Sequence, residues 1–195
     1  MIIYVHGFLS APQSFKARLI AARLAELGLG GAFECPKLPG DPKAAVAAVD
    51  AIVRDANGDV ALIGSSLGGY YATHVAERYG LRTVLLNPVV RPYDLLDDYV
   101  GSHRNLYTGE EIVVEAHHLG ELRSLEVDRL ADPSRYFLIA TTGDEVLDYQ
   151  QAVEKYRGAR QLVIAGGDHS LNTFPAHLDD ALRFCGVAVP ASNGV

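Results

Sequence analysis

The stretch that decides the fold runs from Asp59 to Gly69 and reads Asp-Val-Ala-Leu-Ile-Gly-Ser-Ser-Leu-Gly-Gly. It begins as a short apolar run of the kind that forms a buried strand, and a helical pattern, Gly68–Tyr79, follows it. The motif Gly-x-Ser-x-Gly lies between the two, with Ser66 at its centre. In this strand–turn–helix setting the motif predicts a nucleophile elbow, a tight turn that projects the serine hydroxyl from the top of the sheet.

The two glycines of the motif select Ser66 rather than the neighbouring Ser65 as the nucleophile. A turn this tight brings the residues two before and two after the serine together, and only glycine leaves room there. The backbone N–H of Leu67 then points to the place where negative charge develops during acyl transfer. The stretch lacks the ending of a P-loop and the spacing of a dinucleotide-binding turn, which leaves a purely structural turn as the alternative.

Short apolar runs alternate with helical patterns along the rest of the chain. The runs are Ile2–Val5, Ala32–Pro36, Val60–Ile63, Thr83–Leu86, Tyr136–Ala140 and Gln161–Ala165. The helical patterns are Ser14–Leu27, Pro42–Ala56, Gly68–Tyr79, Tyr149–Tyr156 and Pro175–Cys185. Because the runs are nearly continuous in apolar residues, they are typical of parallel strands covered by helices on both faces. The sequence therefore predicts an α/β fold with a doubly wound, mostly parallel six-stranded sheet, in a single domain over residues 1–186.

Two segments depart from this alternation. Residues 91–128 are polar, with acidic residues interleaved with tyrosines, and lie between the fourth and fifth predicted strands. An excursion of this length in a compact domain is usually functional or disordered, and we interpret it as a small, mostly helical cap insertion. The alternative is a solvated elaboration with no role in binding. We expect residues 187–195 to form a flexible C-terminal tail.

The composition excludes several function classes. The 24 acidic and 17 basic residues give a net charge of −7, which disfavours binding to nucleic acid and docking on anionic membranes. Apolar runs stay well short of the ~18 residues that a membrane helix needs, so we expect no membrane insertion. The first residues lack the features of a signal peptide, and we therefore expect a cytoplasmic protein.

A serine hydroxyl becomes a nucleophile only with a base, and the base needs an orienting carboxylate. His169 follows the last predicted strand in the turn Gly-Gly-Asp-His, and Asp144 follows the strand before it. The carboxyl ends of parallel strands meet at one edge of the sheet, so we expect Ser66, Asp144 and His169 to converge there. Asp148 is the alternative acid.

The second donor for a developing oxyanion is expected in the loop after the first strand, His6-Gly7-Phe8-Leu9-Ser10. If the first strand lies beside the strand of Ser66, the N–H of Phe8 joins that of Leu67 in an oxyanion hole. We expect His6 to brace the loop by hydrogen bonds. His117 and His118 are adjacent and should diverge on a helix, and no metal-ligand spacing occurs elsewhere, so we expect no metal.

Five blocks of sequence in this order resemble the α/β-hydrolase superfamily and, within it, the small YqiA-like esterases. The blocks are Tyr4–Ser10, Gly64–Ala72, Asn87-Pro88 with Arg91–Tyr93, Thr142–Tyr149 and Gly166–His169. The resemblance implies a serine esterase that hydrolyses carboxylic ester or acyl-thioester bonds of small molecules without a cofactor. Its triad would be Ser66, Asp144 and His169.

The resemblance also implies a reduced sheet with the strand order 2-1-3-4-5-6 (strands numbered along the chain). The second strand would lie exposed at the edge, where a partner subunit could cover it, so a homo-oligomer is compatible with the sequence. Two other functions stay open: an acyltransferase or lyase that uses the same triad, and a non-catalytic hydrolase-like binding protein.

Overall fold

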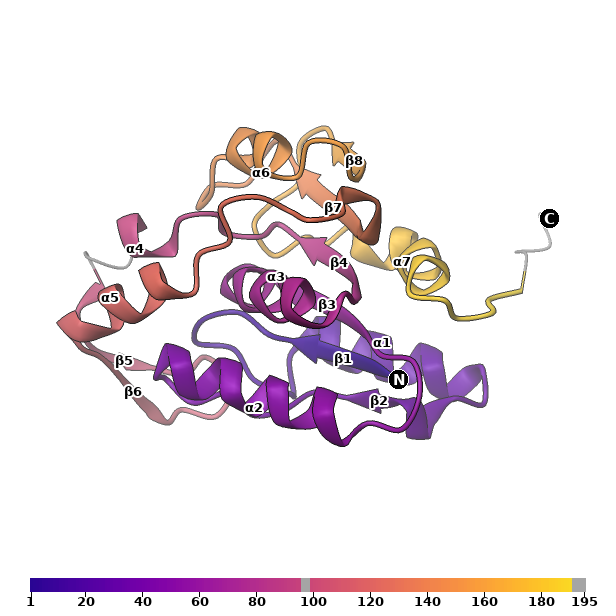
Figure 1. Cartoon of the computed structure of the whole chain (residues 1–195), viewed down its shortest axis with the longest axis horizontal. Coiled ribbons are helices and arrows are strands. Elements are labelled where there is room, and N and C mark those ends of the chain that lie inside the picture. The colour runs from indigo at the N-terminus through magenta and orange to yellow at the C-terminus, as the bar shows by residue number, and fades with distance from the viewer. Residues whose placement is uncertain (96–98, 191–195) are drawn as a thin grey trace.

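The structure, a computed structural model, describes residues 1–95 and 99–190 (Figure 1). Within these residues, a six-stranded sheet has the order β2-β1-β3-β4-β7-β8, and all its neighbouring strands are parallel. The strands are β1 (Ile2–Val5), β2 (Phe33–Glu34), β3 (Ala61–Ser65), β4 (Arg82–Leu86), β7 (Tyr136–Thr141) and β8 (Arg160–Ile164). The predicted fold class and the strand order implied by the resemblance are both confirmed.

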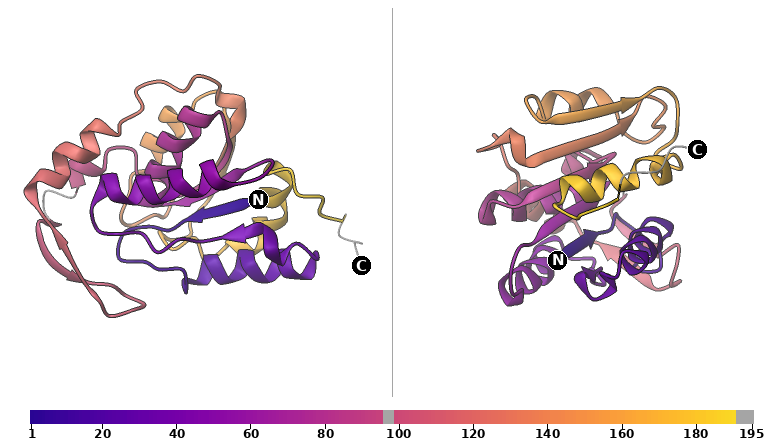
Figure 2. Two further views of the ribbon diagram at one scale, coloured as in Figure 1. Left: turned by 60° about the horizontal axis from the view of Figure 1, so that its bottom comes forward. Right: turned by 90° about the vertical axis from the view of Figure 1, so that its right-hand side faces the viewer.

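Helices cover both faces of this sheet (Figures 1 and 2). They are α1 (Phe15–Glu26), α2 (Pro42–Asp55), α3 (Leu67–Tyr79), α6 (Tyr149–Lys155) and α7 (Leu178–Phe184), with short 3-10 turns at Gly30–Ala32, Pro133–Arg135 and Phe174–His177. Ile3 and Val5 of β1 belong to the core cluster that includes α2 and α3, whereas Ile2 and Tyr4 belong to the cluster that includes α1 and α7. Both faces of the strand are buried, which explains its unbroken apolar sequence.

The helix boundaries follow from local capping. The side chain of Asp41 accepts a hydrogen bond from the N–H of Ala44 at 2.6 Å, and Pro42 occupies the first turn of α2. Helix α3 ends at Tyr79 and is capped by Gly80, which has a left-handed conformation (φ 70°) that glycine adopts without strain.

The insertion between β4 and β7 differs from the predicted, mostly helical cap because it also contains a hairpin. It holds α4 (Pro92–Leu95), the antiparallel strands β5 (Gly101–Arg104) and β6 (Glu111–Val114), and α5 (Ala116–Ser124). The β-branched run Ile112-Val113-Val114 favours a strand. The side chain of Asn105 closes the turn by accepting the N–H groups of Tyr107 and Thr108 at 2.9 and 3.0 Å.

The start of the predicted tail is packed rather than free. Val187 and Val189 contact the core cluster of α1 and α7, and the guanidinium of Arg183 donates to the carbonyl of Pro190 at 3.0 Å. The rest of the predicted tail, residues 191–195, lies outside the described residues. Among the described helices, none combines the length and apolar character that crossing a membrane requires.

Candidate active site

The turn between β3 and α3 explains both glycines of the motif. Ser66 has φ 53° and ψ −123°, a conformation that costs free energy for a residue with a Cβ. A Cβ on Gly68 would lie 2.0 Å from the carbonyl oxygen of Val5, and one on Gly64 would lie 2.6 Å from the carbonyl oxygen of Gly68. Ser65 is buried in β3, whereas Ser66 is partly exposed at the end of the strand.

The loops that follow β7 and β8 meet through a second close approach of glycines. The N–H of Gly143 donates to the carbonyl of Gly166 at 2.9 Å, and a Cβ on Gly143 would lie 2.6 Å from the carbonyl oxygen of Gly167. This approach places Asp144, which follows Gly143, next to Asp168 and His169, which follow Gly167.

Ser66, His169 and Asp144 form a continuous chain of side-chain contacts. The Nε2 atom of His169 lies 3.1 Å from Oγ of Ser66, and its Nδ1 atom lies 2.8 and 3.0 Å from the two carboxylate oxygens of Asp144. With the ring proton assigned to Nδ1, which faces the carboxylate, Nε2 is free to accept the serine proton. The structure therefore brings together the three side chains predicted from the ends of three strands.

The carboxyl group of Asp144 is almost fully buried, with 2% of the side chain exposed. Burial by itself raises its pKa, but the hydrogen bonds from His169 and from the N–H groups of Leu147 and Val146 outweigh burial and lower the pKa overall. Asp144 is therefore a carboxylate at neutral pH, as an orienting partner for an imidazole must be.

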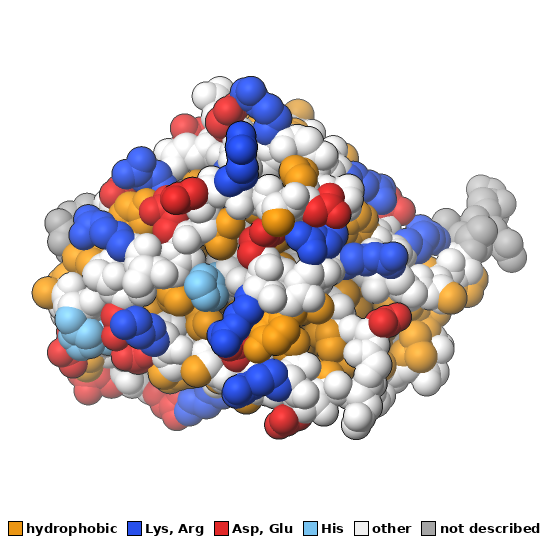
Figure 3. Space-filling model, in the orientation of Figure 1, with side chains coloured by type: hydrophobic (Ala, Val, Ile, Leu, Met, Phe, Trp, Pro, Cys, Tyr) orange, Lys and Arg blue, Asp and Glu red, His pale blue; other side chains and the backbone are white. Residues whose placement is uncertain are grey.

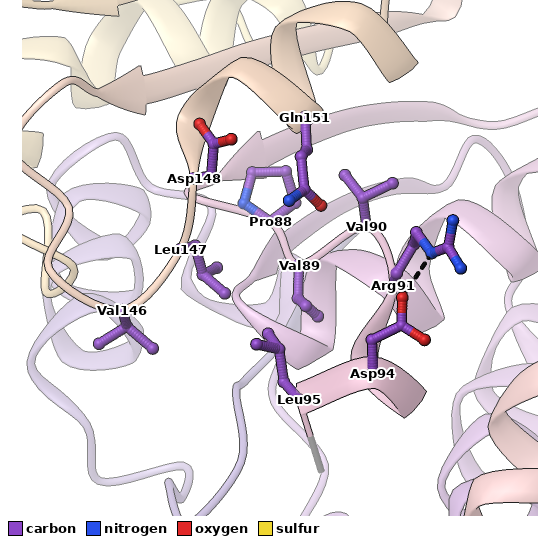
Figure 4. Close-up of a pocket in the computed structure, with 10 residues that line it drawn as sticks. All are labelled: Pro88, Val89, Val90, Arg91, Asp94, Leu95, Val146, Leu147, Asp148 and Gln151. Carbon is purple, nitrogen blue, oxygen red and sulfur yellow. Dashed lines mark ion pairs between the residues drawn. The ribbon is translucent and has the colours of Figure 1, made fainter. Parts of the chain in front are cut away.

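Two other acids near this site, Asp148 and Asp168, do not contact the ring of His169. Asp148 accepts the N–H of Gln150 at 2.9 Å as the N-cap of α6, and it lines a separate hollow of about 90 Å³ (Figure 4). The ion pair of Arg91 and Asp94 lies on the far side of that hollow. The carboxylate of Asp168 binds Asn172. Of the candidate acids, Asp144 is the one that contacts the ring of His169.

The loop after β1 lies against the serine. A Cβ on Gly7 would be 3.1 Å from Cβ of Ser66, so the backbone of this loop passes close to the nucleophile. Within the described residues, the N–H groups of Phe8 and Leu67 donate to no backbone or side-chain acceptor. The Nδ1 atom of His6 lies 3.0 Å from the carbonyl oxygen of Gly7, and its Nε2 atom accepts a hydrogen bond from the N–H of Leu38 at 3.4 Å.

These contacts agree with the bracing role expected of His6. Burial lowers the pKa of its imidazole, so the ring is neutral at neutral pH.

Two residues that support His169 were not recognised from the sequence. Asn87 is buried at the end of β4, and its side-chain amide donates to the carbonyls of Asp168 and His169 at 3.0 and 3.2 Å. The carboxylate of Glu145 accepts the backbone N–H of His169 at 3.0 Å. The sequence signal for Asn87 was its place in an Asn-Pro pair directly after a predicted strand, which by itself specifies no partner.

A second group of titratable side chains lies away from Ser66. The ligand atoms of Asp41, His117, His118 and Glu121 lie within 4.8 Å of one another, so the two histidines do not diverge as expected. However, Nδ1 of His118 accepts the N–H of Glu115, which leaves the ring proton on Nε2, the atom that faces Asp41. This protonation state does not fit a metal ligand.

Comparisons with solved structures identify the fold. The "Putative hydrolase from Agrobacterium vitis S4" has a TM-score of 0.74 and 18% identity, over 93% of this chain and 86% of that chain. Mouse alpha/beta hydrolase domain-containing protein 10 has a TM-score of 0.68 and 19% identity, over 93% and 89%. Est1E from Butyrivibrio proteoclasticus, solved with ferulic acid, has a TM-score of 0.69 and 15% identity, over 95% and 86%. A family model described as "Uncharacterised protein family (UPF0227)" matches residues 1–186.

Proposed function

This chain belongs to the UPF0227 family, the YqiA-like esterases of the α/β-hydrolase superfamily, and on that premise we propose that it is a serine esterase. Its substrates are carboxylic esters or acyl-thioesters, which it hydrolyses through an acyl-enzyme. The observation that carries the proposal is the pair of contacts that His169 makes, 3.1 Å to Oγ of Ser66 and 2.8 Å to Asp144.

In the proposed cycle, Nε2 of His169 takes the proton of Ser66 as the serine oxygen attacks the acyl carbon. The same nitrogen then gives this proton to the leaving alcohol or thiol, and the acyl group stays on the serine. Water, deprotonated by His169, releases the acid in the second half of the cycle. Asp144 holds the imidazole in the required tautomer and stabilises the imidazolium.

The N–H groups of Phe8 and Leu67 hold the oxyanion in both halves of the cycle. The close packing of Gly7 against Ser66 and the start of α3 directly after Ser66 support this assignment. In hydrolases one donor of this kind lowers the barrier by about 2.7–4 kcal/mol.

Labelling with a fluorophosphonate probe tests the nucleophile. We expect the wild-type chain and Ser65→Ala to be labelled and Ser66→Ala to remain unlabelled, because Ser65 is buried in β3. We also expect Ser66→Ala to lose at least about three orders of magnitude in the hydrolysis rate of a short-chain ester. Labelling that persists in Ser66→Ala would contradict the proposal.

A second experiment separates hydrolysis from acyl transfer on the same triad. If the acyl group is transferred to added alcohol or amine faster than it is hydrolysed, the protein is better described as an acyltransferase.

A further inference from the structure

The cavity beside Ser66 has a wall that is rich in hydrogen-bond donors. Its volume is about 250 Å³, below the ~300–1,000 Å³ of pockets for drug-sized ligands, so it suits a small group. The polar side chains among its lining residues include Tyr4, Ser14, Lys16, Ser66, Tyr107 and His169. A pocket for a purely hydrocarbon acyl chain would not be expected to contain a partly buried lysine and several hydroxyl groups.

Helix α1 begins at this wall. Ser14 is its N-cap, and Phe15 and Lys16, the first two residues of the helix, also line the cavity. The first N–H to bond back into the helix is that of Arg18, which donates to the carbonyl of Ser14 at 3.0 Å. The N-terminal end of a helix carries unsatisfied N–H groups and a partial positive charge, which attract anions.

A buried hydroxyl at the same place has no partner. Ser14 is 4% exposed, and its Oγ makes no hydrogen bond within the described residues, including none to the N–H groups at the start of α1. Leaving a buried hydroxyl unsatisfied is unfavourable, because it has lost its hydrogen bonds to water and gained none in return. The phenol of Tyr4 lies close enough to interact with this hydroxyl but forms no hydrogen bond of normal geometry with it. An acceptor oxygen bound in the cavity would satisfy the hydroxyl of Ser14.

Lys16 adds a full positive charge. Its amine donates to the carbonyl of Ser170 at 2.7 Å, which leaves two N–H groups for a ligand. Among the described residues, no carboxylate lies within ion-pair distance of this amine: Asp144 binds His169, and Asp168 binds Asn172. Burial lowers the pKa of Lys16 to about 8, although Asp168 and Asp144 act to raise it, so the amine is charged at pH 7.

We propose that this cavity binds a carboxylate carried by the substrate, through the amine of Lys16, the hydroxyl of Ser14 and the start of α1. The preferred substrates are then small esters or thioesters with a free carboxylate a few bonds from the scissile carbonyl. The inference rests on the proposed esterase function, because the cavity is defined by its position next to Ser66 and His169.

The test compares monoethyl succinate with ethyl butyrate, which has an acyl chain of the same length without the charge. Acid release is followed in a pH-stat at pH 7. We expect wild-type kcat/KM to be at least about tenfold higher for the succinate ester. Lys16→Met should abolish this preference, because kcat/KM for the succinate ester should fall at least about tenfold more than kcat/KM for ethyl butyrate. Lys16→Arg should retain part of the preference. Lys43→Met is the matched control, because Lys43 is exposed on α2 and its loss changes the net charge equally.

A second readout does not need turnover. In Ser66→Ala, calorimetry should detect binding of succinate that is lost when Lys16→Met is added. Equal rates on the two esters, or a parallel fall on both in Lys16→Met, would overturn the inference while the esterase function stands. Failure of fluorophosphonate labelling would instead overturn the esterase function, and succinate binding would still decide whether the cavity takes a carboxylate.

Discussion

Asn87 fixes the backbone of the loop that carries His169. It has φ 40°, and its amide joins β4 to the loop after β8 and to Thr141, whose N–H donates to the amide oxygen at 2.9 Å. We expect Asn87→Ala to lower the free energy of unfolding by about 2–3 kcal/mol, because it leaves buried backbone groups unpaired. We also expect kcat to fall by about 10- to 100-fold, because the imidazole of His169 is no longer held in position between Ser66 and Asp144.

Urea denaturation and steady-state kinetics, at a temperature where the variant is fully folded, separate the two effects. Asn57→Ala, at an exposed position, is the control. A variant that loses stability but keeps the wild-type kcat would show that Asn87 serves folding alone.

The sequence is informative about residues whose roles follow from local geometry. Ser66 was predictable because the glycines two residues before and after it indicate a tight turn. His169 was predictable because it follows a predicted strand in a glycine-rich loop. Asn87 and Lys16 were not, because their roles depend on partners far along the chain. Lys16 contacts Ser170, which is 154 residues away in the sequence, because the start of α1 lies next to the loop that follows β8.

At the scale of elements, the packing of α3 against β1 sets the position of the serine. We expect Gly68→Ala to cost more than about 4 kcal/mol or to prevent folding, because its Cβ would collide with the backbone oxygens of Val5 and His6 at 2.0 and 2.4 Å. Gly120→Ala, inside α5 with open space around it, should instead raise the free energy of unfolding by about 0.5–1 kcal/mol.

Thermal and urea denaturation of the two variants check this pair. A Gly68→Ala chain as stable as wild type would mean that α3 can move away from β1, and the tight-turn explanation of the motif would fail.

The hairpin of β5 and β6 is the element that the sequence did not predict. Its tip binds the loop after β1: the side-chain amide of Asn105 donates to the carbonyl of Ser10 at 2.8 Å, and the N–H of Leu106 donates to the carbonyl of Leu9 at 3.0 Å. A short strand with partly exposed faces shows little hydrophobic periodicity in its sequence. Such a strand can therefore be identified only once its partner strand is known. Leu106 and Tyr107 bring this insertion to the wall of the cavity beside Ser66.

At the scale of the whole molecule, the net charge is −7. On the face shown in Figure 3, acidic and basic side chains are nevertheless interspersed. One edge of the sheet is β2, which spans only Phe33 and Glu34. A strand this short offers few backbone groups for pairing with another chain. Coverage of this edge by a second subunit stays a prediction, which analytical ultracentrifugation can check.

The ion pair of Arg23 and Asp179 ties α1 to α7 and makes stability depend on pH. Nε and Nη2 of Arg23 bind the two carboxylate oxygens of Asp179 at 2.8 and 2.9 Å, and this contact lowers the pKa of Asp179 below its ordinary 3.8. A lowered acid pKa stabilises the fold above the ordinary value, and this contribution disappears as the pH falls through the lowered pKa. With the side chains 28% and 34% exposed, we expect Asp179→Asn to cost at most about 1 kcal/mol at pH 7.

Urea denaturation of wild type and Asp179→Asn from pH 7 to pH 2.5 measures this linkage. The difference in free energy of unfolding should stay constant down to about pH 5 and approach zero near the acid limit, because Asp179 is then protonated in both states. Asp55→Asn is the control, since Asp55 is exposed, forms no ion pair among the described residues and changes the net charge equally. If both variants showed the same pH dependence, net charge rather than the contact between α1 and α7 would govern the acid sensitivity of the fold.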